Sequence, residues 1–393
     1  MEFNPYSMEY FNDPYPIYRH LRDEAPVYHN GELGFYALSR FEDVLGAHID
    51  HQTYSSARGI MIQDMDPAFL EALPMMIMMD PPRQTRLRKL ISRAFTPKKV
   101  AAMEPQIREI CIRVLEPLVE RGSCDFVTEF AAVMPMELIS TLLGVPEEDH
   151  RRVRDWVDLS LTREPGCPEI PWEAVEAMGK LTSYFRDLLH ERRRHPGNDV
   201  LSFLLEVEAP AEDGGTTKLS EPEVLGFAGL LAGGGNETVT KLLGNALVLF
   251  HRHPDQRKRI AEDPTLIPRG IEEALRYWPP SQIQGRSATR DVELHDVRIP
   301  AGSRVLLLTG AACRDEREFE NADVFDIDRE IPIQLALGHG AHKCLGAFLA
   351  RLEARVAFEE LLKRSSEFAV DEAHSQRVHM TNVAGYASIP VSF

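Results

Sequence analysis

Apolar residues recur at three- and four-residue spacing over most of the chain between Pro82 and about Arg252. This period is typical of amphipathic helices. The pattern breaks at residues 144–146, which read Gly-Val-Pro, and at 195–199, which read His-Pro-Gly-Asn-Asp. Clusters of glycine and proline end helices. The middle of the chain is therefore predicted to be a long series of helices with short connections.

The pattern changes toward both ends of the chain. A helix is predicted over residues 14–25, followed by a hairpin whose strands at 27–30 and 33–38 flank an Asn-Gly turn. Later, a short apolar run at 305–308 indicates a strand, and a final amphipathic helix is predicted from about 345 to 364. The expected fold is mainly α with a smaller β region, whose parts are residues 26–60, 280–310 and 370–393.

Charge and cysteine content exclude several classes of protein. Lys and Arg number 44 and Asp and Glu 61, a net charge of −17 that disfavours nucleic-acid binding. The five cysteines are widely spaced and form no CxxC pair, which disfavours a disulfide framework. Because the sequence shows no signal peptide and no run of 18 apolar residues, we expect a cytoplasmic protein without a membrane span.

The segment that says most about chemistry is a glycine-rich loop at residues 337–346, Leu-Gly-His-Gly-Ala-His-Lys-Cys-Leu-Gly. It delivers Cys344 to the start of the last predicted helix. Gly338 and Gly340 can adopt positive φ and let the backbone close around the sulfur. Amide N–H groups and the helix N-terminus then stabilise a thiolate, which is a good ligand for iron.

Two other interpretations of this loop remain. In the first, Cys344 is a small buried residue behind a glycine turn, as free cysteines often are. In the second, His339, His342 and Cys344 bind zinc, although no fourth ligand occurs at the usual spacing.

A second unusual segment lies at residues 232–238, Ala-Gly-Gly-Gly-Asn-Glu-Thr, inside an apolar helical pattern. Each glycine costs about 1 kcal/mol relative to alanine in a helix interior. Close approach of a ligand is the natural reason for three of them, and a simple packing groove is the alternative. No GK[ST] sequence follows, which disfavours a phosphate-binding loop.

Both segments resemble motifs of the cytochrome P450 family. The loop is similar to the haem-binding signature F-G-x-G-x-H-x-C-x-G, with Leu337 in place of Phe. The glycine segment is similar to A-G-x-[DE]-T, with Gly234 in place of Ala. The resemblance implies haem b as the cofactor, Cys344 as the axial ligand of its iron, and His342 as a contact of a haem propionate.

The same resemblance assigns roles on the opposite side of the cofactor. Glu237 and Thr238 match the acid and the alcohol that manage protons for bound oxygen. Gly234 and Gly235 border the haem at an interrupted turn of the helix, and Gly234 should widen the groove there.

Further matches concern the haem propionates. Residues 80–88, Asp-Pro-Pro-Arg-Gln-Thr-Arg-Leu-Arg, resemble D-P-P-x-H-x-x-x-R. Arg88 keeps the charged contact of that motif, whereas Gln84 replaces its His and offers a neutral hydrogen bond. Arg286 matches the propionate-binding Arg of the family.

One more match concerns structure. Glu273 and Arg276 match the structural E-x-x-R pair, although helices contain many such pairs. The family often adds an Arg just ahead of a Phe, but Val324 precedes Phe325 here, so the third partner is not identified.

The resemblance implies a function for the whole chain. It predicts a single haem domain over residues 1–393, of the soluble bacterial type, that inserts one oxygen atom from O₂ into an apolar small molecule. Because no flavin or nicotinamide domain fits in the chain, a separate ferredoxin with its reductase would supply the electrons. The alternatives are a non-catalytic haem protein that binds or senses a small ligand, and a peroxide-driven haem enzyme. Glu237 and Thr238 disfavour both.

The expected electron donor would meet a basic surface. Every charged residue from Arg83 to Lys99 is basic, against the acidic background of the chain. In the family, this helix and the loop before the cysteine border the surface where an acidic electron carrier docks. The expected docking residues are Arg83, Arg86, Lys89, Arg93 and Lys343. A solvated helix face is the alternative.

Overall fold

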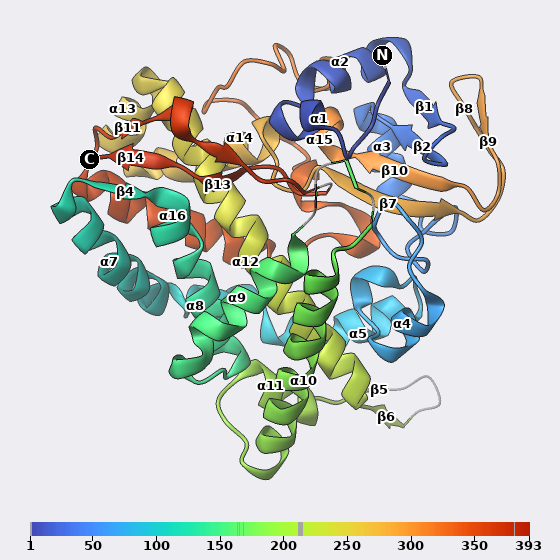
Figure 1. Ribbon diagram of the computed structural model, residues 1–393, viewed down its shortest axis with the longest axis horizontal. Helices are drawn as coiled ribbons and strands as arrows, with labels where there is room; N and C mark the ends of the chain where they lie inside the picture. Colours follow the sequence, from blue (N-terminus) through green and yellow to red (C-terminus); the bar gives the residue numbers. More distant parts are fainter. Residues whose placement is uncertain (1, 163, 165, 168, 211–214, 381) are drawn as a thin grey trace.

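One long helix, α12 (Glu221–Arg252), runs through the middle of the molecule (Figure 1). The computed structural model describes residues 2–162, 164, 166–167, 169–210, 215–380 and 382–393. A capping box starts α12, in which the side chains of Ser220 and Glu223 each accept a hydrogen bond from the other's backbone N–H. Every position from Val239 to Phe250 is buried, because this half of the helix is apolar on nearly all sides. The remaining helices therefore pack around α12.

Helices dominate the described residues. The other α-helices are α1 (Met8–Asn12), α2 (Tyr15–Glu24), α3 (Phe41–Ile49), α4 (Pro67–Ala72), α5 (Arg83–Ile91), α6 (Pro97–Ala101), α7 (Glu104–Arg121), α8 (Val133–Leu143), α9 (His150–Leu161), α10 (Trp172–Arg194), α11 (Val200–Glu206), α13 (Pro254–Glu262), α14 (Ile267–Tyr277), α15 (Thr309–Ala312) and α16 (Ala347–Arg364). The short helical turns are η1 (Met76–Met78), η2 (Ser92–Ala94), the π-helical η3 (Val127–Ala131), η4 (Glu147–Asp149), η5 (Pro264–Leu266), η6 (Leu335–Leu337), η7 (Gly340–His342) and η8 (Glu372–His374).

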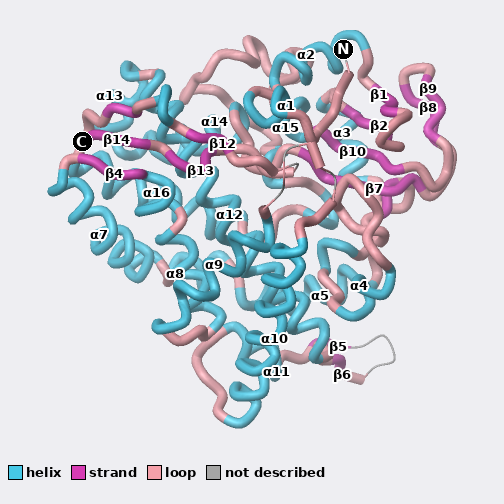
Figure 2. The backbone as a smooth tube through the Cα atoms, in the orientation of Figure 1, coloured by secondary structure: helices cyan, strands magenta, loops and turns pink. Residues whose placement is uncertain are grey.

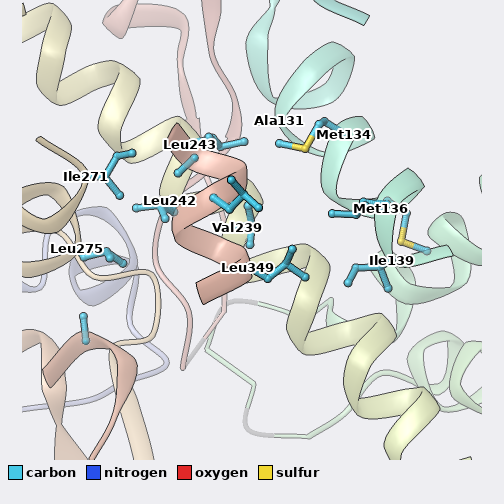
Figure 3. Close-up of a cluster of buried hydrophobic side chains, with 14 of the residues drawn as sticks. Ala131, Met134, Met136, Ile139, Val239, Leu242, Leu243, Ile271, Leu275 and Leu349 are labelled. Atoms are coloured by element: carbon cyan, nitrogen blue, oxygen red, sulfur yellow. The ribbon is translucent and has the colours of Figure 1, made fainter. Parts of the chain in front are cut away.

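The core around α12 joins helices that are far apart in the sequence (Figure 3). Val239, Leu242 and Leu243 of α12 lie among side chains of α8, α14 and α16. Fully burying such a side chain contributes about 1.5–3 kcal/mol each. The labelled neighbours are Met134, Met136 and Ile139 of α8, Ile271 and Leu275 of α14, and Leu349 of α16. This packing fixes the start of α16 beside the middle of α12.

The strands gather in two main places, which Figure 2 shows in magenta. A five-stranded sheet has the order β1-β2-β10-β7-β3, and a three-stranded sheet near the C-terminus has the order β11-β14-β4. Three pairs, β5-β6, β8-β9 and β12-β13, complete the set among the described residues. The strands are β1 (Val27–Asn30), β2 (Phe35–Leu38), β3 (Tyr54–Ser55), β4 (Ser123–Asp125), β5 (Ala209–Pro210), β6 (Thr216–Thr217), β7 (Ile283–Ala288), β8 (Val292–Leu294), β9 (Val297–Ile299), β10 (Arg304–Leu308), β11 (Ala369–Val370), β12 (Gln376–Arg377), β13 (Tyr386–Ser388) and β14 (Pro390–Ser392).

The predicted fold class, mainly α with a smaller β region, is confirmed. The predicted hairpin forms, but its turn is wrong: β1 pairs with β2 across residues 31–34, a longer connection than a two-residue Asn-Gly turn. The side chain of Asn30 accepts hydrogen bonds from the N–H groups of Glu32 and Leu33, and Gly34 takes the positive φ of 71°. The Asn side chain therefore organises the turn through its oxygen.

The predicted Glu273–Arg276 pair is buried and gains a third member. The Arg276 Nη2 to Glu273 Oε1 distance is 2.7 Å, and the two side chains are 0% and 1% exposed. Arg276 also donates to the carbonyls of Cys313 and Ala322. The third partner is Arg329, whose Nε lies 3.3 Å from Glu273 Oε1. Arg329 and the carbonyls of Cys313 and Ala322 thus join α14 to the segment that precedes the Cys344 loop.

This arrangement predicts unequal costs for removing the two arginines. Arg276→Met should lower the free energy of unfolding by about 3–5 kcal/mol, because Glu273 would keep a buried charge without its close partner. Arg329→Met should cost less, since it removes the longer contact with Glu273 and bonds to backbone carbonyls but leaves the buried Glu273–Arg276 pair in place. The thermal unfolding midpoints of the purified variants measure both. In a Glu273→Met background, Arg276→Met should cost less than it does alone. An Arg329→Met variant less stable than Arg276→Met would contradict this reading.

Candidate functional site

The loop before α16 holds Cys344 in the way that the sequence predicts. Gly338 and Gly340 take positive φ angles of 65° and 62°. The N–H of Cys344 donates to the carbonyl of Leu337 over 2.8 Å, which closes the loop. α16 begins at Ala347, directly after its N-cap Gly346. The cysteine therefore lies just before the N-terminus of a long helix.

The sulfur of Cys344 has opposing influences around it. Burial raises the pKa of its thiol, whereas the backbone N–H of Gly346, Arg88 and Arg351 lower it. By surface area, however, Cys344 is the exposed cysteine of the chain. The side chain of Cys344 thus keeps an accessible surface at which a ligand can bind. Among the described residues, His339, His342 and Cys344 form no group that could hold a metal ion by themselves, so the zinc alternative gains no support.

Two predicted residues of α5 bind the backbone of the same loop. Arg88 Nη2 donates to the carbonyl of Lys343 over 2.6 Å. The buried side chain of Gln84 donates to the carbonyl of Ala341, also over 2.6 Å. Gln84 thereby braces the loop, a role that its replacement of the family's His did not suggest.

Arg286 is buried and His342 is half-buried, and each keeps polar atoms without a partner among the residues that the structure describes, although one ring nitrogen of His342 bonds the backbone of Met79. Arg286, on β7, is 3% exposed, and its side chain donates a hydrogen bond to the carbonyl of Gly285 over 2.8 Å. No ion pair of Arg286 occurs among the described residues. Burial, reinforced by Arg304, lowers its pKa to about 10. Burial and Arg286 lower the pKa of His342 to about 4, and its Nε2 has no hydrogen-bond partner in the described part of the chain.

A buried cation and a buried ring nitrogen of this kind need an acceptor. A negatively charged group supplied by a ligand would satisfy both. Haem fits this requirement, because it carries two carboxylates at its edge and an iron at its centre for the nearby sulfur.

The glycines of α12 face open space on one side. A Cβ atom added to Gly233 would meet nothing within 4 Å, and one added to Gly234 would meet only Leu230 Cδ1 at 3.9 Å. Gly235 differs, because its Cβ would lie 3.0 Å from Ile139 Cδ1 of α8. Close helix packing thus explains Gly235, while room beside the helix explains the other two. The predicted interrupted turn is wrong, since α12 is helical throughout Glu221–Arg252.

Glu237 and Thr238 lie on the same stretch of α12 with different partners. The hydroxyl of Thr238 donates to the carbonyl of Gly234 over 2.7 Å. Glu237 is buried, and its Oε1 lies 2.8 Å from Nζ of Lys241 one turn later. Lys241 also donates to the carbonyl of Tyr386 over 3.0 Å. Lys241 therefore connects the carboxylate of Glu237 to the C-terminal strands. The hydroxyl oxygen of Thr238 can still accept a hydrogen bond.

Sequence reasoning missed two residues of this region. Lys241 could have been found, because Glu and Lys four residues apart form pairs on helices. His48 of α3 gave no sequence signal: its side chain is 4% exposed, and Arg286, His342 and His339 lower the pKa of its ring electrostatically. Only the fold brings α3 to the loop that contains Cys344.

The basic residues of the predicted docking surface differ in their local partners. Arg83 lies 3.7 Å from Glu71, and Arg86 forms an ion pair with Glu223. Arg93 donates to the carbonyl of Glu208 over 2.6 Å. Lys89 and Lys343 are exposed, and the described residues offer them no ion pair. The contact of Arg88 with Lys343 places these two lysines on one side of the molecule.

Comparisons with known proteins agree on one family. The family model described as Cytochrome P450 matches residues 172–388. Cytochrome P450 130 of Mycobacterium tuberculosis is 40% identical over 95% of this chain and 93% of its own. Vitamin D(3) 25-hydroxylase of Pseudonocardia autotrophica is 38% identical over 98% and 95%. The structure of cytochrome P450 CYP109Q5 from Chondromyces apiculatus superposes with a TM-score of 0.89, at 34% identity, over 99% and 97%. None of the described helices is both long enough and apolar enough to cross a membrane.

Proposed function

The chain belongs to the cytochrome P450 family of haem-thiolate monooxygenases, and from this premise we propose that Cys344 is the iron ligand of its haem b. The enzyme takes O₂ and a small molecule, as its family does. In this proposal residues 1–393 act as one haem domain that inserts an oxygen atom into an apolar substrate. The observation that carries the proposal is the loop that presents Cys344 at the start of α16, and whose His342 interacts with Arg286, a buried cation with no ion pair among the described residues.

Thiolate-ligated haem supplies the activation of O₂, because the sulfur pushes electron density toward the iron. The chain's own residues would hold and orient the cofactor. Arg286 and His342 would bind a propionate, since Arg286 has no ion pair among the described residues and His342 Nε2 has no hydrogen-bond partner there. Arg88 would add a positive charge next to Cys344, and Gln84 would keep the loop in place through Ala341.

Glu237 and Thr238 would move protons on the other side of the cofactor. Thr238 donates its only hydroxyl proton to Gly234, so toward the cofactor it acts as a hydrogen-bond acceptor. Asp158 of α9 lies near Glu237 and Lys241, and burial followed by Glu237 raises its pKa to about 6. Its side chain is 44% exposed, so it can exchange protons with solvent. The proposed route therefore runs from Asp158 to Glu237 and then to Thr238.

The segment of methionines after α4 supports an apolar substrate. A Cβ on Gly229 would meet Cε of Met75 at 3.7 Å, and one on Gly226 would meet the carbonyl of Pro74 at 2.4 Å. This segment thus lies against α12 just before the open side of Gly233. Flexible thioethers adapt to irregular apolar ligands. The relative named vitamin D(3) 25-hydroxylase makes large apolar ring compounds the class to screen first.

The electron donor would be a ferredoxin-type protein with an acidic surface. The exposed lysines Lys89 and Lys343 flank the side of the molecule nearest the Cys344 loop. Arg83, Arg86 and Arg93 extend the positive charge, although each is engaged locally. Electrostatic complementarity of this kind mainly accelerates association.

We expect Cys344→His to abolish the red-shifted Soret band of the ferrous carbonyl complex, because that band requires a thiolate opposite the carbonyl. Absorbance of the reduced protein under carbon monoxide is the measurement. Cys313→Ala is the matched control, since this buried cysteine lies outside the loop and should keep the band. A Cys344→His variant that retains the band would remove Cys344 as the ligand.

Thr238→Ala should divert electrons from product to hydrogen peroxide, while haem content and substrate binding stay near wild type. The reason is that the variant lacks the hydroxyl oxygen that accepts a hydrogen bond at the end of the proposed proton route. Product formed per reducing equivalent should fall severalfold, whereas Thr238→Ser should keep most of the coupling. Equal coupling in Thr238→Ala would mean that the hydroxyl serves only its bond to Gly234.

A Lys89→Glu and Lys343→Glu double variant should slow reduction by an acidic ferredoxin, most strongly at low ionic strength. Stopped-flow reduction rates over a salt series measure this effect. Lys258→Glu on α13 is the control, because its side chain is 76% exposed on a different helix. Reduction of the double variant at the wild-type rate in low salt would exclude this surface.

A further inference from the structure

His48 is a buried histidine that the established motifs do not use. It lies near the C-terminal end of α3 (Phe41–Ile49), and its side chain is 4% exposed. Neither Nδ1 nor Nε2 has a hydrogen-bond partner among the described residues. A buried imidazole normally satisfies at least one nitrogen, because an unpaired buried donor costs free energy. The two ring nitrogens therefore need a hydrogen-bond partner that does not belong to the described residues.

The surroundings of the ring indicate the charge of that partner. Burial first, and then Arg286, His342 and His339 in that order, lower the pKa of His48 to about 3. The ring thus stays neutral with one N–H donor. Asp80 is the carboxylate that acts on both Arg286 and His342, but its oxygens already accept from the hydroxyl of Ser55 and the N–H of Ser56. The Arg286 cation and the unpaired ring nitrogens of His48 and His342 therefore indicate a position suited to an anion.

The backbone fixes this position against the cysteine loop. A Cβ on Gly340, whose φ is 62°, would lie 2.5 Å from the carbonyl oxygen of His48. The end of α3 thus packs directly on the loop that presents Cys344. His48 reaches the site from a third part of the chain, separate from α5 and β7.

We propose that His48 is a further cofactor-binding residue, whose ring N–H donates a hydrogen bond to the haem propionate held by Arg286 and His342. This inference rests on the proposed haem function. A metal ion in the same place is disfavoured, because the Arg286 guanidinium would repel it and the described residues include no cluster of three metal ligands there. Two alternatives remain for the experiment to distinguish: the His48 ring only packs against its neighbours, or it bonds a buried water.

The first test replaces the ring by one of similar shape without nitrogen. His48→Phe holoprotein should lose haem to apomyoglobin faster, on the order of tenfold, because a hydrogen bond to a charged group is lost. His48→Gln should show a smaller increase, since its amide can donate. His253→Phe is the matched control: that ring bonds the carbonyl of Leu249 instead, and its replacement should leave the rate unchanged.

The second test changes the cofactor. In protein reconstituted with haem dimethyl ester, the difference in haem loss between wild type and His48→Phe should largely vanish, because the negative carboxylates are gone. A difference of the same size with both haems would overturn the proposal and indicate packing or a bridging water. An unchanged rate of loss of ordinary haem in His48→Phe would also overturn it.

A spectroscopic readout covers the case in which His48→Phe does not fold with haem. The propionate bending band in the resonance Raman spectrum should shift in His48→Gln holoprotein, and an unshifted band would overturn the proposal. The two levels of inference remain separable. The red-shifted carbonyl band should be present in every haem-loaded His48 variant, whatever the rate of haem loss. The proposed function itself would fail if the Cys344→His variant kept this band.

Discussion

Buried positive charge is the constraint on which the site depends. Arg286 lies inside the protein with no described carboxylate paired to it, and unpaired ring nitrogens of His342 and His48 accompany it. Burial of an unpaired cation is costly, so such a cluster is stable only when an anion completes it. Three distant segments, α3, β7 and the loop before α16, supply these groups. Their convergence makes the folded core and the cofactor site parts of one electrostatic arrangement.

The helical core determines the opposite side of the site. Because α12 is buried on all sides from Val239 onward, this half holds the helix in position although the first half contains glycines. Gly233 and Gly234 leave open space, while Gly235 admits the close approach of α8. The Glu237–Lys241 pair then connects this stretch to the strand that contains Tyr386. Rigid packing thus positions groups that have different tasks a few residues apart.

Much of this arrangement could be predicted from local sequence. Helix periodicity, the glycine loop and the position of Cys344 before a helix all depend on neighbouring residues, and Gly338 and Gly340 adopt the expected φ angles. Contacts between distant segments were less accessible. Nothing near His48 indicates that α3 reaches the loop, and the third partner of Glu273 proved to be Arg329, beyond the position that the motif suggested. The uninterrupted α12 shows a further limit: neighbouring helices can keep three glycines helical despite their low propensity.

The contact between Lys241 and the C-terminal strands also limits how this sequence can vary. A Cβ on residue 385 would lie 2.8 Å from Cβ of Lys241, so the glycine there and the lysine on α12 form a matched pair. Chimeric enzymes that import a C-terminal segment from a relative would inherit one half of this pair without the other. In evolutionary terms, positions 241 and 385 should change together, and recombination breakpoints between them should be selected against.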